Sequence, residues 1–317
     1  MERVDSRREH FRGKELQFGH TLPVFDLRYH VASLTAVFVA LVIGILVGVG
    51  LSGKGFVNDA ERANLNRQIE DMRQERDGAQ KSLESASRGQ QALKDFADAA
   101  YPAVVPGQLE GKRVAVLFIG PIDRTVSFAI DKAVRDAGGT VVRTLSIGVP
   151  IDPRVVQEAL RRKPALRQLA GTDRLEALGR ALSDELAAGG PTPLWDALGE
   201  FLVQERAGSA TPRADALVVV RTAEPQLGVT KKFLSGIYTG LGRSGAPAVG
   251  TEAAGAATSA IPAFALAGLS TVDSVDTAAG RLGLVLLLGG AEPGSYGVGK
   301  NAGDGVLPAI PPAPSTG

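Results

Sequence analysis

The longest uninterrupted apolar run lies near the N-terminus. Between Tyr29 and Gly53 the chain carries no formal charge apart from the titratable His30. Spanning the hydrocarbon core of a bilayer takes about 20 such residues. We therefore predict a single transmembrane helix over residues 29–53, after an N-terminal tail over residues 1–28. A buried core helix and a cleaved signal peptide are the alternatives. The run exceeds a typical signal-peptide core, and no clear A-x-A site follows it.

Small residues recur at every fourth position of this predicted helix. Gly44 and Gly48 form a GxxxG pair, and small side chains let two membrane helices approach closely. The pattern predicts a helix dimer in the membrane, and a chance bias in an Ala- and Gly-rich chain is the alternative. The predicted packing stripe consists of Ala32, Ala36, Ala40, Gly44, Gly48 and Ser52.

Residues 56–100 are polar, and apolar side chains recur there with alternating spacings of three and four. This spacing is typical of a coiled coil, so we predict a stalk that forms a homo-oligomer. Arg76 and Gln90 interrupt the seam, which favours weak pairing or a different protein partner for the stalk. A single solvated helix is the alternative. The predicted seam consists of Leu65, Ile69, Met72, Ala79, Leu83, Ala86 and Leu93.

Beyond Pro102 short apolar runs alternate with helical patterns. This alternation predicts an α/β domain over residues 110–300, with a parallel sheet of about five strands in a Rossmann-like or flavodoxin-like order. The Pro- and Gly-rich residues 301–317 are expected to be disordered. Strands are predicted over residues 113–120, 140–147, 214–221, 246–250 and 269–275. Helices are predicted over 123–137, 153–170, 172–188 with Thr172 as N-cap, 194–206, 228–243, 256–267 and 277–288.

Composition narrows the chemistry that this domain can perform. The net charge of +1 argues against a nucleic-acid partner. The chain has no cysteine, and its three histidines, His10, His20 and His30, all lie at or before the start of the apolar run. From residue 54 onward the sole methionine is Met72. Nucleophilic triads therefore lack their usual members, and we expect neither an enzyme nor a cofactor or metal site.

Two glycine patterns resemble phosphate-binding loops but lie in the wrong context. Gly48–Gly53 fits G-x-G-x-x-G at the end of a membrane helix, and Gly240–Gly245 fits it at the end of a soluble one. Acidic side chains at predicted strand ends could do acid–base chemistry. Helix capping is the simpler role for them, and Asp276 is predicted to be the N-cap of the last helix. The other polar residues at strand ends are Asp123, Arg124, Arg221, Thr222, Glu252 and Asp273.

Two stretches resemble a known family. Residues 25–38 read FDLRYHVASLTAVF, and residues 268–281 read GLSTVDSVDTAAGR, followed by YGVG over 296–299. In this order they resemble the actinobacterial copper-transporter family of the MctB type, over nearly all of residues 24–308. Members commonly begin close to the first motif, so translation is hypothesised to start at Val24.

The resemblance implies a role in copper efflux or copper homeostasis at the cell membrane, with the C-terminal domain outside the cytoplasm. Basic residues flank the apolar run almost equally, so the positive-inside rule barely favours either orientation. Copper ligands are missing after the membrane segment apart from Met72, so any copper role is expected to be indirect. A coiled-coil scaffold in cell-envelope remodelling or cell separation is the alternative function.

Overall fold

The computed structural model describes residues 27–52, 59–209 and 211–310. Most of the N-terminal tail, including His10 and His20, lies outside the described residues, as do 53–58 and 311–317. The chain divides into two compact units, residues 1–80 and residues 81–317. The second unit contains the end of the stalk and the sheet, and we call residues 105–310 of this unit the head.

The first helix, α1 (Leu27–Ser52), contains residues 29–52 of the predicted membrane span. Within it, Arg28–Gly50 is long and apolar enough to cross a bilayer, and no part of its most apolar stretch is buried in the protein. Large apolar side chains therefore face outward along the helix, as lipid contact requires.

The second helix, α2 (Asp59–Val104), contains residues 59–100 of the predicted stalk and continues past its expected end. Pro102 lies inside its last turn. A proline there removes one backbone donor at the end of the helix, where a short continuation is still tolerated. At about 1.5 Å per residue, a helix of 46 residues is about 70 Å long.

The head contains a seven-stranded sheet in the order β3-β2-β1-β4-β5-β6-β7. All neighbouring strands are parallel except β3, which pairs antiparallel with β2 at one edge. Without β3 the order is flavodoxin-like, with the change of direction between β1 and β4. The strands are β1 (Arg113–Ile119), β2 (Thr140–Ile147), β3 (Val203–Gly208), β4 (Ala216–Arg221), β5 (Ala248–Thr251), β6 (Ser270–Val272) and β7 (Ser295–Tyr296).

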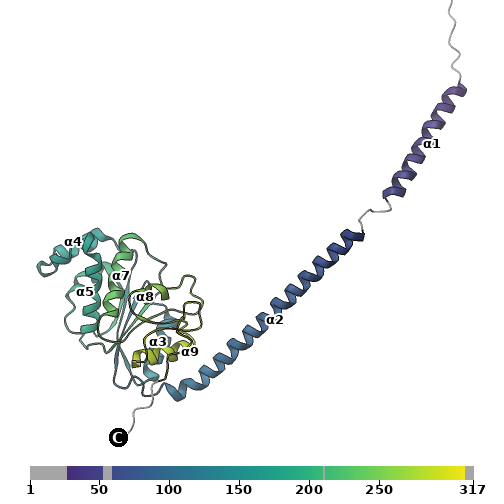
Figure 1. Cartoon of the computed structure of the whole chain (residues 1–317). Helices are drawn as coiled ribbons and strands as arrows, with labels where there is room; N and C mark the ends of the chain where they lie inside the picture. Colours follow the sequence, from purple (N-terminus) through teal and green to yellow (C-terminus); the bar gives the residue numbers. More distant parts are fainter. Residues whose placement is uncertain (1–26, 53–58, 210, 311–317) are drawn as a thin grey trace, which may run out of the picture. The chain divides into compact units, whose positions relative to one another are not determined.

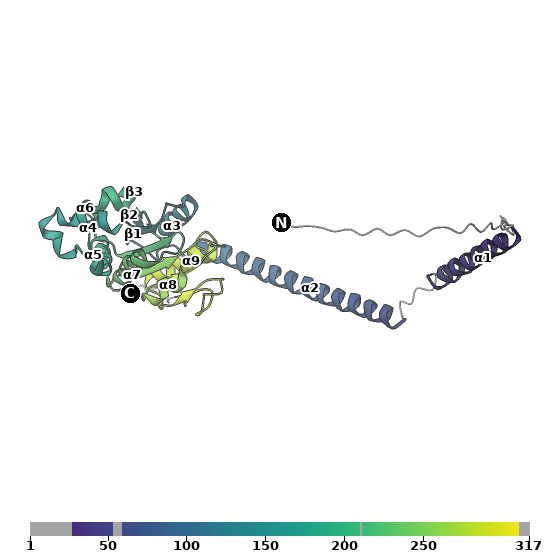
Figure 2. The same ribbon diagram turned by 90° about the horizontal axis from the view of Figure 1, so that it is seen from above.

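Helices cover both faces of this sheet (Figures 1 and 2). One face packs against α3 (Arg124–Asp136) and α9 (Ala278–Gly289) through a core that includes Phe118 and Ile130. The other face packs against α4 (Pro153–Arg161), α5 (Leu175–Ala188), α6 (Pro193–Leu202), α7 (Gly228–Gly242) and α8 (Ile261–Leu266). Both faces are buried, which explains why the strands are continuously apolar in sequence.

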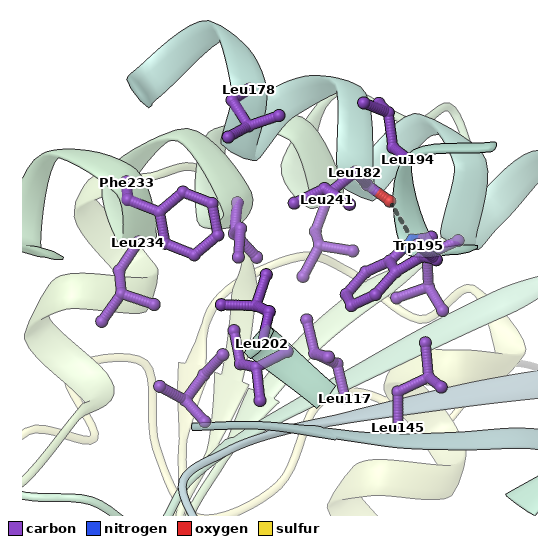
Figure 3. Close-up of a cluster of buried hydrophobic side chains, with 14 of the residues drawn as sticks. Leu117, Leu145, Leu178, Leu182, Leu194, Trp195, Leu202, Phe233, Leu234 and Leu241 are labelled. Atoms are coloured by element: carbon purple, nitrogen blue, oxygen red, sulfur yellow. Dashed lines mark hydrogen bonds between the residues drawn. The ribbon is translucent and has the colours of Figure 1, made fainter. Parts of the chain in front are cut away.

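The larger core lies under α5, α6 and α7 (Figure 3). Leu117 and Leu145 point into it from neighbouring strands and meet the buried ring of Trp195. The Trp195 Nε1 donates a hydrogen bond of 2.9 Å to the carbonyl oxygen of Leu182. This bond satisfies the one polar group that the indole carries into the core.

Four sequence predictions about elements are wrong at their ends. The helix predicted over 256–267 begins only at Ile261. The helix predicted over 194–206 ends at Leu202, because Val203 onward pairs with the free edge of β2 as β3. The helix predicted over 153–170 breaks before Pro164, and residues 164–169 form the 3₁₀ helix η1. Thr172 is no N-cap, since 172–174 form a second 3₁₀ turn, η2, ahead of α5.

The sheet also exceeds the expected five strands, because β3 and the two-residue β7 were not anticipated. The structure describes residues 301–310 of the stretch that is expected to be disordered. Pro308 is buried there, and Leu307 packs against the core under α9. Packing against residues that are distant in sequence decides the number of strands and the structure of residues 301–310. The local sequence pattern does not carry that information.

Candidate functional site

A wide groove lies where the last turns of α2 meet the head. Its volume is about 790 Å³. One wall is α2 from Gly89 to Asp98, and the other combines the start of α9 with the loop after β7. We call it the stalk-base groove. Its lining is largely small and apolar, and the side chains that give it shape are Leu93, Lys94, Arg281, Val298 and Val306.

The wall on the head side is made by the two halves of the second family motif. Asp273 follows β6 and is buried, with 6% of its surface exposed. Its carboxylate oxygens accept hydrogen bonds from the backbone nitrogens of Val298 (3.0 Å) and Gly299 (2.8 Å). Two amides therefore satisfy the buried carboxylate, and they hold the YGVG loop against the end of β6.

Gly297 is required for this contact. Its φ of +137° is a conformation that residues with a side chain rarely adopt. A Cβ built at Gly297 would lie 2.3 Å from the Cγ of Asp273. The loop can approach the carboxylate this closely because glycine leaves the space open.

The turn that leads into α9 is also tightly specified. Ser274 has a φ of +53°, which is uncommon for a residue other than glycine. Its carbonyl oxygen accepts hydrogen bonds from the backbone nitrogen (2.9 Å) and the hydroxyl (2.7 Å) of Thr277. The Thr277 hydroxyl in turn accepts a hydrogen bond from the backbone nitrogen of Gly280 (3.1 Å) and caps α9.

The predicted cap at Asp276 is therefore wrong by one residue. Asp276 instead accepts a hydrogen bond of 2.7 Å from the backbone nitrogen of Ala254, which ties the turn to the loop after β5. Threonine takes the capping position because its hydroxyl reaches the N3 nitrogen while its own backbone stays extended.

The stalk is built into the head at this site. Ala97 is fully buried against Ala278 and Ala279. Tyr101 lies one turn after Ala97 in α2, and the guanidinium of Arg281 lies over its ring, 5.4 Å from the ring centre. Small side chains let α2 and α9 come close, and the cation–π contact adds to the apolar packing.

The hydroxyl of Tyr101 fixes the same helix to α3. It donates a hydrogen bond of 3.0 Å to the Oδ2 of Asp136. Burial, together with this hydrogen bond to a carboxylate, raises the pKa of Tyr101 to about 12. The phenol therefore stays protonated near neutral pH and keeps the hydrogen bond to Asp136.

The other polar residues at strand ends serve structure. Asp123 caps α3 by accepting from the backbone nitrogens of Thr125 and Val126, as predicted. Glu252 accepts from the Ser259 hydroxyl and the Ala260 nitrogen, just before α8. Arg221 donates to the carbonyl oxygen of Thr258.

The place where a flavodoxin-like sheet usually binds a ligand lies between β1 and β4. Thr222 lies at that place and donates to the carbonyl oxygens of Ile119 and Pro121. A Cβ at Gly120 would meet the Ala223 nitrogen at 2.7 Å, so the chain itself packs closely there. Gly240 and Gly242 of the second loop-like pattern are packed against α5 and against Ala267.

The predicted packing stripe lies along α1, with Ser52 as its last residue. A Cβ added at Gly44 or Gly48 would meet nothing within 4 Å, so both positions have room for a neighbouring helix. The seam residues toward the N-terminal end of α2 are exposed, with Leu65 at 54% and Leu83 at 66%. Leu93 differs, because it is half-buried in the stalk-base groove. The C-terminal end of the predicted seam therefore packs against the head of the same chain.

Copper as a cargo ion does not fit the donors of the head. Cu(I) prefers thiolate or thioether ligands, and copper in general accepts imidazole. The chain beyond residue 54 offers none of these except the exposed Met72 of the stalk. Within the described ranges, no three His, Asp or Glu side chains come close enough to share a metal ion.

The sequence alone did not reveal the contacts of Asp273, Tyr101 and Val298 that join the end of α2 and the YGVG loop to the rest of the head. Asp273 was recognisable as a polar residue at a strand end, but its partners lie 25 and 26 residues further along the chain. Tyr101 gave no signal, because its partners Asp136 and Arg281 are far away in sequence.

Comparison with known proteins agrees with the motifs. The family model described as "Copper transport outer membrane protein, MctB" matches residues 24–307. The chain is 27% identical to the "Copper transporter MctB" of Mycobacterium tuberculosis (strain H37Rv), over 88% of this chain and 98% of that protein. The protein of the same name from Mycobacterium bovis matches with the same identity and coverage.

Proposed function

The chain belongs to the MctB copper-transport family, and from that premise we propose that it is a membrane-anchored protein that supports copper homeostasis through a protein partner. In this proposal α1 spans the cell membrane once, and the head lies outside the cytoplasm. The head performs no catalysis. It binds the partner and leaves the ligation of copper to it.

The observation that carries the proposal is the stalk-base groove. Residues of the second motif form one wall of it, and that wall combines glycines, alanines and Val298 with the charged side chains of Asp276 and Arg281. Such a surface suits a protein segment better than a metal ion, since copper ligands are lacking. Val298 is 52% exposed at its rim, which leaves an apolar contact unsatisfied in the chain alone.

The exposed seam of the stalk offers a second contact surface. We propose that it pairs two copies of the chain, with the packing stripe of α1 doing the same in the membrane. A dimer would place two grooves near each other and raise the affinity for a partner that engages both.

The test is a deletion strain that is complemented with variants of the gene. Leu93→Glu together with Val298→Glu places two charges in the groove. We expect this variant to restore copper tolerance poorly, although the protein accumulates in the membrane. Phe128→Glu is the matched control, because Phe128 is 64% exposed on α3 and lies outside the groove. It should complement fully.

The two possible functions separate in the same strain. Copper sensitivity that the groove variant fails to correct supports the proposal. Normal copper tolerance combined with unseparated cells would favour the scaffold in cell separation instead. Titration of the purified full chain with Cu(I) adds a direct measurement, and a tight stoichiometric site would contradict the indirect role.

A further inference from the structure

One side of the head concentrates positive charge. Residues 150–174 and 224–232 carry eight basic and four acidic side chains, a net charge of +4 in a chain whose total is +1. The rest of the chain is therefore net negative. We call this surface the basic end. Its basic side chains are all exposed, and they are Arg154, the run 161–163, Arg167, Arg174, Lys231 and Lys232.

The fold brings these two stretches together. The backbone nitrogen of Ile151 donates a hydrogen bond of 3.3 Å to the Thr230 hydroxyl at the start of α7. α5 follows η1 and η2 and runs beside α7 in the same direction, since Glu176 meets Gly236 and Ser183 meets Gly240. The first turns of both helices thus lie at one end of the head, with α4 projecting beside them (Figures 1 and 2).

Most of this charge is available to a partner. In the described part of the basic end, the ion pair that forms joins Arg162 to Glu158. Arg161 donates to the side chain of Gln157, and Arg167 donates to a backbone carbonyl, so neither is neutralised by these contacts. Clustered exposed cations attract an anionic surface and are strongly screened by salt.

Apolar side chains stand among these charges. Leu227, just before α7, is 81% exposed, and Val229 in its first turn is 38% exposed. A soluble polyanion would use the cations but would leave these side chains in water. An anionic bilayer uses both, because cations meet the headgroups while exposed apolar side chains enter the interface.

We propose that the basic end binds the surface of an anionic lipid bilayer. A bilayer is the occupant because it engages the exposed cations and the exposed apolar side chains of Leu227 and Val229 together. The head then has a lipid-binding surface of its own, a role that goes beyond copper homeostasis.

The experiment uses the full chain in nanodiscs of phosphatidylcholine. Flotation measures its binding to vesicles made of equal parts phosphatidylglycerol and phosphatidylcholine, or of phosphatidylcholine alone. The charge variant combines Arg161→Glu, Arg162→Glu and Lys163→Glu. The control variant combines Arg124→Glu, Arg243→Glu and Lys300→Glu, three exposed residues elsewhere that give the same change in net charge. Circular dichroism checks that both fold.

We expect binding to the anionic vesicles alone, with a loss of about tenfold or more in the charge variant and little change in the control. Leu227→Ser should weaken binding at high salt, where the apolar contact remains. Equal binding to both vesicle types, or equal loss in both triple variants, would overturn the proposal. So would tight binding to soluble polyglutamate that is unaffected by Leu227→Ser, since that points to an acidic polymer.

Discussion

Asp215 and Arg113 illustrate how single residues hold the sheet in register. The guanidinium donates from Nε (2.8 Å) and Nη2 (3.0 Å) to the Asp215 carboxylate, which also accepts from the Arg113 backbone nitrogen (3.0 Å). The pair joins the starts of β1 and β4. The hydrogen bond from the arginine side chain is the largest cause that lowers the pKa of Asp215 from 3.8 to about 2.

The stability of the protein should depend on pH through this pair. Because the pKa is lower in the folded state, the stabilisation is present above about pH 4 and is lost as the pH falls toward about 2. Both side chains are partly exposed, so Asp215→Asn should cost about 1 kcal/mol or less near neutral pH. Denaturant unfolding at several pH values measures this cost.

The gap between wild type and Asp215→Asn should close over that acidic window. Asp71→Asn, on the exposed stalk, is the control for the removal of one carboxylate. A gap that stays constant down to about pH 2 would mean that the carboxylate acts through something other than its charge.

At the scale of elements, α5 and α7 are in unusually close contact. A Cβ at Gly236 would lie 2.1 Å from the carbonyl oxygen of Glu176. Gly236→Ala should therefore destabilise the head by about 1–3 kcal/mol, although alanine is the better helix former. Thermal or denaturant unfolding measures the loss.

Gly78→Ala in α2 is the matched control, because a Cβ there would meet nothing within 4 Å. With no clash, only the helix propensity changes, and the stalk should gain up to about 1 kcal/mol. If both substitutions shift stability in the same direction, close packing of α5 on α7 is not what selects glycine.

The stalk gives a second prediction at this scale. Ile69→Asp together with Leu83→Asp places two charges on the exposed seam, and we expect the oligomer to weaken because buried charge opposes pairing. Sedimentation in detergent reports the mass. Gln74→Asp with Ser85→Asp adds the same charge to the opposite face and should leave the mass unchanged. A monomer in all three proteins would reject the seam.

The elements also show what sequence pattern can predict. The apolar run of α1, the stalk and strands β1, β2, β4, β5 and β6 follow from periodicity, and the all-buried α9 follows from its unbroken apolar stretch. β3 was predicted as helix because its pairing with β2 is decided by an exposed edge far away in sequence. The groove was beyond reach for the same reason, since Asp273 and Val298 meet through the tertiary fold.

For the whole molecule, the main prediction concerns its attachment. Since α1 is the one span that the described residues offer, the full chain should stay in the membrane fraction through alkaline and high-salt washes. Removal of residues 1–58 should release it completely in the high-salt wash, which also screens the cations of the basic end. Release of the intact chain by high salt would instead indicate a peripheral protein held by charge.

The burial of Ala97 and the position of Tyr101 have a practical consequence for anyone dissecting this protein. The sequence suggests truncating the chain at Pro102 or Pro106, where the polar stalk gives way to the alternating strands and helices of the head. The compact unit begins at Lys81, so the last part of α2 belongs with the head. A fragment that starts at the prolines would bare the alanines of α9 and the ring-facing side of Arg281 to water. Any aggregation of such a fragment would then result from the truncation and would not be a property of the intact protein.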